Sequence, residues 1–154
     1  MLRTLARPRD KAELLRRLAA VQPESTRRFG RMSPHQMICH VSDAFRMATG
    51  EKAVSPATSL LHRTLVKWIA LYVPLPWISG IVTRPEIDQE MGGTRPTDFA
   101  ADVAQLATLV EMITAAPPDT LDGVAHPVFG PMSFSAWLRW GYLHMDHHLR
   151  QFGA

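Results

Sequence analysis

Two histidines near the end of the chain have the spacing of metal ligands on a helix. His144 and His148 are four residues apart, so on a helix their side chains project from the same face, one turn apart. A helical wheel places them on one arc with Trp137 and Trp140. The opposite arc carries charged residues, Arg139, Asp146 and Arg150. We therefore predict that both histidines point inward, where a divalent cation would satisfy the lone pairs of two buried imidazoles.

A third histidine lies on a helix whose start is clearly marked. Ser33 and Gln36 form the pattern of a reciprocal N-terminal cap, with a proline at the first helical position. The apolar stripe of this helix contains Met37, Val41, Ala44, Phe45 and Ala48. His40 falls inside this stripe. We therefore take His40, His144 and His148 as a three-imidazole site between two helices, with a position left for water or substrate, as in catalytic zinc sites.

The two helices that would carry these ligands begin with similar phrases. Gly30-Arg31-Met32-Ser33 precedes one helix, and Gly130-Pro131-Met132-Ser133 precedes the other. Counted from each serine, the ligands come at plus seven, plus eleven and plus fifteen, and these offsets differ by about one helical turn. Both helices are thus predicted to present their histidines to one site.

Several polar residues near these histidines have both a functional and a structural interpretation. Asp43, one turn after His40, could orient that ligand or accept a proton, although a surface aspartate is the simpler interpretation. His126 could reach the site, or the turn that contains it could only shape a loop. Gln151, one turn beyond His148, could contact substrate or the second nitrogen of a ligand. No general base is assigned. Any buried histidine could also be an ordinary hydrogen-bonded core residue.

Three segments of the chain resemble the DinB-like superfamily, in a branch described only as a domain of unknown function. They are the ending from His144 to Gly153, the phrase from His126 to Gly130, and the segment from Gly30 to His40. The resemblance implies a four-helix bundle, usually dimeric, that holds nickel, zinc or a similar divalent ion through the three histidines named above. Characterised relatives include thiol-dependent transferases and a maleylpyruvate isomerase, so the resemblance indicates a site more sharply than a reaction.

Cap and breaker residues predict five helices, over residues 10–21, 33–49, 56–72, 97–116 and from 133 onward. Asp10 is expected to cap the first helix, Thr97 or Asp98 to cap the fourth, and Gly50 to end the second. Residues 74–96 are expected to be irregular, and no strand is expected because no segment sustains the required alternation. The predicted fold class is all-α: an up-and-down four-helix bundle with an additional short helix.

The composition is that of a globular protein, with 46% hydrophobic and 20% charged residues. The chain, residues 1–154, is predicted to form a single domain. Its net charge of +3 is uneven, because the first 31 residues hold nine Lys or Arg and three acidic residues. A solvated first helix explains this basic segment better than a nucleic-acid interface does, because no nucleic-acid motif accompanies it. We expect no nucleic-acid partner.

The single cysteine, Cys39, excludes an internal disulfide and fits a reducing compartment. No targeting signal is visible, so a cytoplasmic location is expected. Cys39 precedes His40, but adjacent helical residues diverge by about 100°, so Cys39 is expected to pack as a small hydrophobic residue. His35 lies off the apolar stripe and His147 at the edge of the inward face of the last helix, and neither is taken as a ligand.

The run from Leu65 to Val82 is strongly apolar. A lysine, two prolines and a glycine interrupt it, so no membrane span is expected. The run also contains more apolar surface than a small monomer readily buries, which predicts a homodimer. Its aromatic residues could form a subunit contact or one wall of the pocket: Trp68, Tyr72 and Trp77.

Two functions remain open at this point. The first is a divalent-metal-dependent enzyme, a transferase or hydrolase acting on a small molecule, with a thiol as one candidate substrate and zinc or nickel as the expected ion. The second is a non-catalytic metal-binding or protein-interaction module. An open coordination position beside a pocket would favour the enzyme, and Gly141 is expected to leave space there. A site sealed by tryptophans would favour the module.

Overall fold

The computed structural model describes residues 2–154. Within these residues the chain forms five α-helices, α1 (Pro8–Ala19), α2 (Pro34–Thr49), α3 (Lys67–Tyr72), α4 (Phe99–Ala115) and α5 (Phe134–Arg150). The smaller elements are a π-helical turn directly before α3, two 3-10 turns and a two-stranded hairpin: η1 (His62–Val66), η2 (Pro85–Ile87), η3 (Pro118–Thr120), β1 (Ala125–His126) and β2 (Gly130–Pro131). The two strands pair antiparallel. The predicted all-α class is confirmed.

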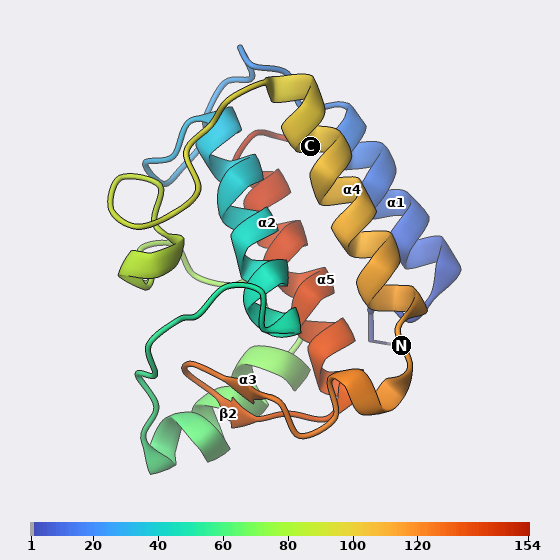
Figure 1. The fold of residues 1–154 in the computed structure, drawn as a ribbon, viewed down its shortest axis with the longest axis vertical. Helices are drawn as coiled ribbons and strands as arrows, with labels where there is room; N and C mark the ends of the chain where they lie inside the picture. The colour runs from blue at the N-terminus through green and yellow to red at the C-terminus, as the bar shows by residue number, and fades with distance from the viewer. Residues whose placement is uncertain (1) are drawn as a thin grey trace.

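The four long helices lie side by side as a bundle, and α3 and the hairpin cover one end of it (Figure 1). Helix α2 packs against α4 and α5, and α1 packs against α5 and α4. The colours of Figure 1 show that α1 and α5 run in one direction and that α2 and α4 run in the other. This order arises because the long connection between α2 and α4 returns the chain to the end of the bundle at which α2 began. The structure is thus the expected four-helix bundle with an additional short helix, but its helices do not alternate up and down as predicted, because α2 and α4 are parallel.

Side-chain caps start the three longest helices, as predicted. The Ser33 hydroxyl accepts from the Gln36 backbone N–H (3.1 Å), and the Gln36 side chain accepts from the Ser33 N–H (2.8 Å). The Ser133 hydroxyl accepts from Ala136 N–H (3.2 Å), and the Asp98 carboxylate accepts from Ala101 N–H (2.8 Å). Each cap satisfies a backbone donor that the first helical turn leaves without a partner. These contacts fix where α2, α4 and α5 begin.

Three local predictions were wrong. Helix α1 begins at Pro8, with Arg7 at the cap position, because the buried Asp10 carboxylate instead accepts from Thr4 N–H (3.0 Å) and holds the N-terminal arm. The third helix begins at residue 60 rather than 56, since Ala57 N–H donates to the Pro127 carbonyl (2.8 Å). The hairpin was missed because two-residue strands are too short to show alternation.

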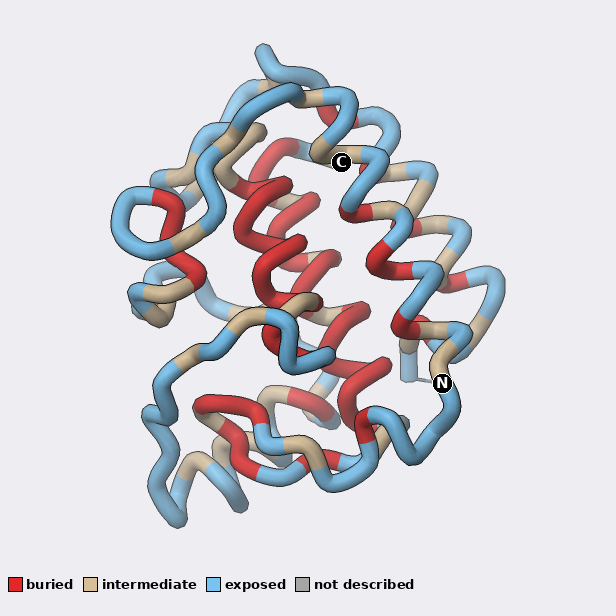
Figure 2. The backbone as a smooth tube through the Cα atoms, viewed as in Figure 1, coloured by how far each residue is buried: buried red, intermediate tan, exposed pale blue. Residues whose placement is uncertain are grey.

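The buried residues concentrate in α2 and α5, which are the central helices (Figure 2). Leu14 and Leu18 of α1 and Val21 just after it are buried. The opposite arc of α5 is covered in part: Asp146 and Arg150 are partly exposed, but Arg139 is 7% exposed and its Nε donates to the Leu71 carbonyl (2.8 Å). Burial on both sides makes α5 the core helix of the bundle.

Gly141 serves helix packing rather than a pocket, contrary to the sequence-based expectation. A Cβ atom at this position would lie 2.8 Å from Leu5 Cδ1 and 3.1 Å from Phe45 Cε1. The missing side chain therefore lets α5 approach both α2 and the N-terminal arm closely.

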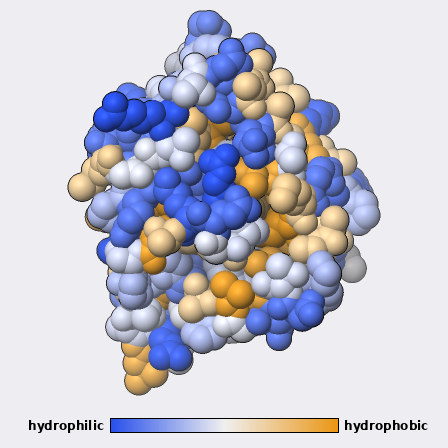
Figure 3. Space-filling model, viewed as in Figure 1, coloured by the Kyte–Doolittle hydropathy of each residue, from blue (hydrophilic) through white to orange (hydrophobic). Residues whose placement is uncertain are grey.

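The segment from residue 60 to residue 82 contrasts with this core. Its large apolar side chains are widely exposed: Leu60, Leu61, Leu65, Trp68, Ile69, Tyr72, Leu75, Ile78, Ile81 and Val82. Figure 3 shows apolar surface at the lower left, where this segment begins. Within residues 2–154, no helix combines the length and the apolar character that a membrane span requires.

Candidate metal centre

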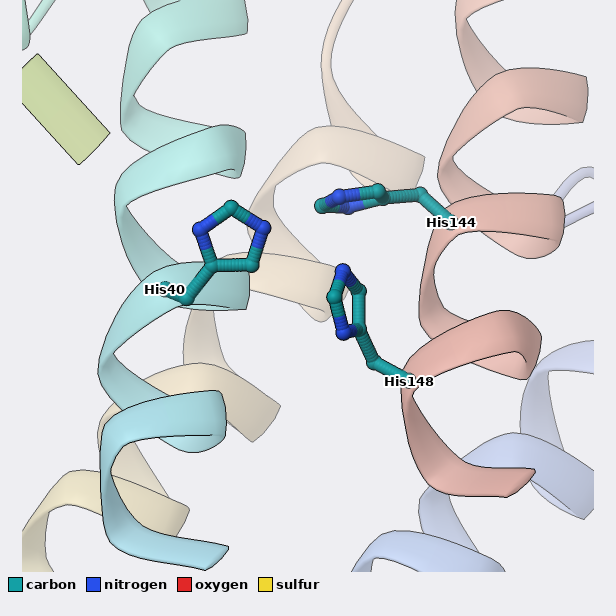
Figure 4. Close-up of side chains that lie close together, drawn as sticks. All are labelled: His40, His144 and His148. Atoms are coloured by element: carbon teal, nitrogen blue, oxygen red, sulfur yellow. The ribbon is translucent and has the colours of Figure 1, made fainter. Parts of the chain in front are cut away.

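The structure brings His40 of α2 together with His144 and His148 of α5. The centroid of the His40 ring lies 5.2 Å from that of His144 and 4.7 Å from that of His148. The centroids of the two α5 rings are 4.6 Å apart. One nitrogen from each ring lies within 4.8 Å of the others. Figure 4 shows the three rings pointing toward one another across the space between the two helices. All three histidines are buried.

The register of the two helices explains this convergence. Ser33 and Ser133 are the actual N-cap residues of α2 and α5. The ligand positions therefore lie whole turns from equivalent starting points, and the packing of α2 against α5 brings the two faces together.

Hydrogen bonds fix which nitrogen of two of the rings faces the centre. His40 Nδ1 donates to the Ile87 carbonyl (2.8 Å), and His148 Nδ1 donates to Gln151 Oε1 (2.9 Å). Because a neutral imidazole carries one proton, the Nε2 atoms of these two rings keep their lone pairs. Of the two contacts suggested for Gln151, the structure shows the one with the second nitrogen of a clustered histidine. The Ile87 carbonyl was not foreseen, because a backbone group in an irregular stretch leaves no signal in the sequence.

The third ring has a nitrogen that the protein leaves without a partner. His144 Nδ1 is buried and has no hydrogen-bond partner within residues 2–154. An unpaired buried polar atom is costly unless another group meets it. Three imidazoles that offer lone pairs to one point form a donor set suited to zinc, nickel, copper or iron. The residues present therefore fit a divalent metal ion.

Burial keeps these rings in the state that binds a metal. Burial lowers the pKa of His40 below its ordinary value, although the Ile87 hydrogen bond and the nearby Asp43 carboxylate partly oppose this. Burial lowers the pKa of His144 and of His148 well below the ordinary value, and each is lowered further by neighbouring histidines. All three rings are thus neutral near pH 7, and no proton competes with a metal ion for their lone pairs.

Aromatic rings surround the cluster. Trp140 stacks on His144 with a centroid distance of 4.8 Å and an angle of 12°. Trp77 lies 6.2 Å from the His144 ring and 6.3 Å from the His147 ring, and its Nε1 donates to the Ala70 carbonyl (2.8 Å). Trp77 thus borders the site, as the sequence suggested.

The other aromatic residues of the apolar run lie in a different environment. Trp68 is 58% exposed and Tyr72 is 42% exposed, and both line a surface pocket with Arg63 and Lys67. His147 is buried beside Phe29 but does not join the three-histidine cluster. Only Trp77 of the three predicted aromatic residues therefore contacts the site.

Asp43 holds the loop that orients His40. The aspartate is fully buried rather than on the surface as the simpler interpretation had it, and it makes no hydrogen bond to His40. Its carboxylate accepts from Thr94 N–H (2.7 Å) and from Gln89 Nε2 (3.1 Å). The same loop supplies the Ile87 carbonyl, so Asp43 acts on His40 through the backbone of residues 87–94.

His126 shapes the hairpin turn. Its Nδ1 accepts from the N–H groups of Val128 (3.1 Å) and Phe129 (3.2 Å), and its ring stacks on Phe129. Burial lowers the pKa of His126 to about 3. Of the two interpretations of this residue, the turn is the one that the contacts support.

Cys39 points away from the cluster, as expected, but it does not pack as a simple hydrophobic residue. Its Sγ lies 3.7 Å from Asp102 Oδ2 of α4. Burial, with a smaller contribution from Asp102, raises the pKa of the Cys39 thiol to about 12.

Trp77 also lines a surface pocket. This pocket has a volume of about 360 Å³ and is lined by Trp77, Pro74, Pro76, Tyr142 and Arg150 among others. None of the three clustered histidines lines it. Trp77 therefore borders both this pocket and the histidine cluster.

Comparison with known proteins identifies the family. Comparison with curated proteins and with solved structures gives no match. The family model of the DinB superfamily matches residues 1–152, in agreement with the resemblance of the histidine-rich ending and with the helical bundle. The chain therefore belongs to the DinB superfamily.

Proposed function

We propose that the protein binds one divalent metal ion through His40, His144 and His148, with zinc or nickel as the resident ion. The observation that carries this proposal is the convergence of three neutral, buried imidazoles, one of which has an unpaired nitrogen. Two of the three are oriented by Ile87 and Gln151, as ligating histidines usually are by an acceptor on the second nitrogen.

Elemental analysis of the gently purified protein tests this proposal. We expect the His144→Ala, His148→Ala double variant to hold about one equivalent of metal per chain less than the native protein. The His62→Ala variant is a matched control, because His62 bonds to Ser59 outside the cluster, and it should keep the metal. A double variant that holds as much metal as the native protein would place the site elsewhere.

We further propose that the protein is an enzyme, a transferase or hydrolase that acts on a small molecule such as a thiol. Catalytic zinc sites use three protein ligands and keep a further position for water or substrate, whereas structural sites use four. An ion held by three neutral imidazoles would supply Lewis-acid activation of a water or a thiol. The protein residues would exclude bulk water and orient the ligands, with Trp140 stacked on His144 and Trp77 at the edge.

The position of Trp77 suggests how a substrate would approach. This residue borders both the histidine cluster and the 360 Å³ pocket. A small molecule bound in that pocket would have to pass the indole ring to reach the histidines. We infer that Trp77 controls access, and that its movement or replacement would open the site.

The same aromatic cover favours a second candidate, a non-catalytic metal-binding or interaction module. The three rings are at most 9% exposed. Cobalt substitution separates the two functions, because the visible spectrum of the bound ion changes when azide or a small thiol coordinates to it. A change on titration supports the enzyme. An unchanged spectrum with both ligands, in the native chain and in Trp77→Ala, would leave the module as the better interpretation.

We also propose that the protein is a homodimer that buries the apolar surface of residues 60–82. The support is the exposure of ten large apolar side chains in this segment, more than monomers usually leave in one area. Light scattering at micromolar concentration should give about twice the chain mass of 17.2 kDa. A monomer across that range would refute the dimer.

A further inference from the structure

A second group of metal-ligating side chains lies on the other face of α2. His35 and Cys39 come from α2, and Asp102 comes from α4. One ligand atom from each of the three lies within 4.8 Å of the others. His35 Nε2 is 2.7 Å from Asp102 Oδ2, and Cys39 Sγ is 3.7 Å from the same oxygen. Imidazole, thiol and carboxylate therefore meet at one point between two packed helices.

The helices position these groups as firmly as they position the three-histidine cluster. His35 and Cys39 are four residues apart, so they project one turn apart from the face of α2 that packs against α4. The His35 ring meets the Phe99 ring edge-on at 5.2 Å. The Asp102 carboxylate also accepts from Thr97 N–H (3.1 Å), which orients it as outer hydrogen bonds orient metal-ligating carboxylates.

Hydrogen bonding alone leaves this arrangement crowded. The contacts of His35, Cys39 and the Thr97 N–H all converge on Oδ2 of Asp102. A carboxylate oxygen offers about two lone-pair directions, so three donors compete for one atom. A cation beside that oxygen would remove the competition, because His35 and Cys39 would then face the cation with lone pairs rather than protons.

We propose that His35, Cys39 and Asp102 form a second metal site, for a zinc-class divalent ion. The donor set of one nitrogen, one sulfur and one oxygen is one that zinc accepts. Ligand atoms in a tetrahedral zinc site lie roughly 3.5 Å apart, from metal–ligand distances of about 2.0–2.3 Å. The three separations here bracket that value, so shifts of about 1 Å would suffice. Water completes the coordination from the side where His35 and Asp102 are partly exposed.

Binding at this site exchanges a proton for the ion. The Cys39 S–H bond breaks, its proton passes to solvent, and the sulfur lone pair forms the bond to the metal. No oxidation or reduction takes part. The ion would join α2 to α4 one residue from His40.

Cobalt titration of the metal-free full-length chain tests this site without knowledge of any reaction. The three-histidine cluster contains no sulfur, so a sulfur-to-cobalt charge-transfer band in the near ultraviolet reports only on Cys39. We expect two cobalt ions per chain and this band in the native protein. The His144→Ala, His148→Ala variant should keep the band with one ion, so failure of the first site would not obscure the second.

Two further variants complete the test. Cys39→Ser should lose the band and one equivalent of cobalt. Asp102→Asn, which preserves shape and a hydrogen-bonding oxygen, should weaken cobalt binding at this site at least tenfold, and circular dichroism would establish that each variant is folded. Absence of the band from the native protein at saturating cobalt would overturn the proposal, regardless of the results with the variants. The three residues would then serve only as a hydrogen-bonded link between α2 and α4.

Discussion

The α2–α5 interface and the segment of residues 60–82 are both rich in apolar residues, but the interface is buried and the segment is exposed. Phe45 and Trp137 at the interface are each 1% exposed, whereas Leu60 is 78% and Val82 is 90% exposed. The interface helices are long, side-chain capped and covered on both sides. The short helix that begins at residue 60 is capped only by a longer bond, from His62 N–H to the Ser59 hydroxyl (3.3 Å), and prolines follow it. Burial thus depends on partners as much as on composition.

This contrast also explains where histidines can be held neutral. Five histidines lie on or beside α5 and α2 among aromatic rings and are buried: His40, His126, His144, His147 and His148. Packing on every side removes water from these rings and lowers their pKa values. The exposed segment offers no comparable environment within the part of the chain that the structure describes, and its role is better sought at its surface.

The largest expected effect comes from truncating a core residue at the interface. Phe45→Ala should lower the free energy of unfolding by about 3–5 kcal/mol, because it removes a fully buried ring and leaves a cavity. Leu65→Ala removes a side chain that is about half exposed and should cost less than about 0.5 kcal/mol in the monomer. Urea unfolding at low protein concentration measures both. Equal losses of unfolding free energy in the two variants would mean that Leu65 is buried in solution, contrary to the contrast between the two regions.

Acid should destabilise the interface in the absence of metal. Burial lowers the pKa of His126 from 6.5 to about 3, and the three clustered histidines shift in the same direction. The unfolded chain therefore binds protons first, so stability is complete above about pH 6.5 and falls as the pH drops toward 3.

Urea unfolding of the metal-free protein at about pH 7 and about pH 5 measures this loss. The His126→Gln variant keeps an acceptor for the turn and should lose less stability over this range than the native chain does. A native stability that is the same at both pH values would contradict the burial of the four rings.

Removing a helix cap should also cost more stability in the buried helices α2 and α5 than in the exposed helix, although each loss is smaller than that of a core residue. Ser33→Ala and Ser133→Ala should each cost about 1 kcal/mol, because each leaves a backbone N–H of the first turn without its acceptor. Ser59→Ala, before the exposed helix, loses a longer bond to His62 N–H (3.3 Å) and should cost only a few tenths, about 0.3 kcal/mol. Thermal unfolding of the three variants ranks them. A larger loss for Ser59 than for Ser133 would reverse the expected order.

The smallest effect on monomer stability, with a clear effect on assembly, is expected at Leu65. Leu65→Glu places a charge on the exposed apolar surface and should reduce the light-scattering mass from about twice 17.2 kDa to 17.2 kDa. Met112→Glu is a matched control, because Met112 is exposed to the same degree on α4, and it should leave the mass unchanged. A dimer that persists in Leu65→Glu would mean that the contact does not involve the segment.

The sequence predicts those parts of the structure that depend on local patterns. The caps at Ser33, Asp98 and Ser133 and the stop at Gly50, with a φ of 80°, are confirmed. The inward direction of His40, His144 and His148 also follows from helical phase. Their role as metal ligands stays a prediction.

Other features depend on contacts between distant segments and could not be read from the chain. Arg139 has the wheel position of a surface residue, but the N-terminal arm and α3 cover it. Asp43 is buried because residues 89 and 94, far along the chain, supply its donors. The meeting of Cys39 with Asp102 likewise requires the packing of α2 against α4. A charged side chain alone does not reveal which loop will cover it.

Because the caps fix where α2 and α5 begin, the number of residues from each cap serine to its histidines sets the direction in which those histidines point. One residue inserted between Ser133 and His144 would rotate everything beyond it by about 100° and advance it by about 1.5 Å, which would carry both α5 histidines away from His40. The same insertion in residues 51–59 would lengthen a connection and leave every ligand in place. The protein can therefore vary in length between its helices, but the distance from each cap to its histidines is fixed.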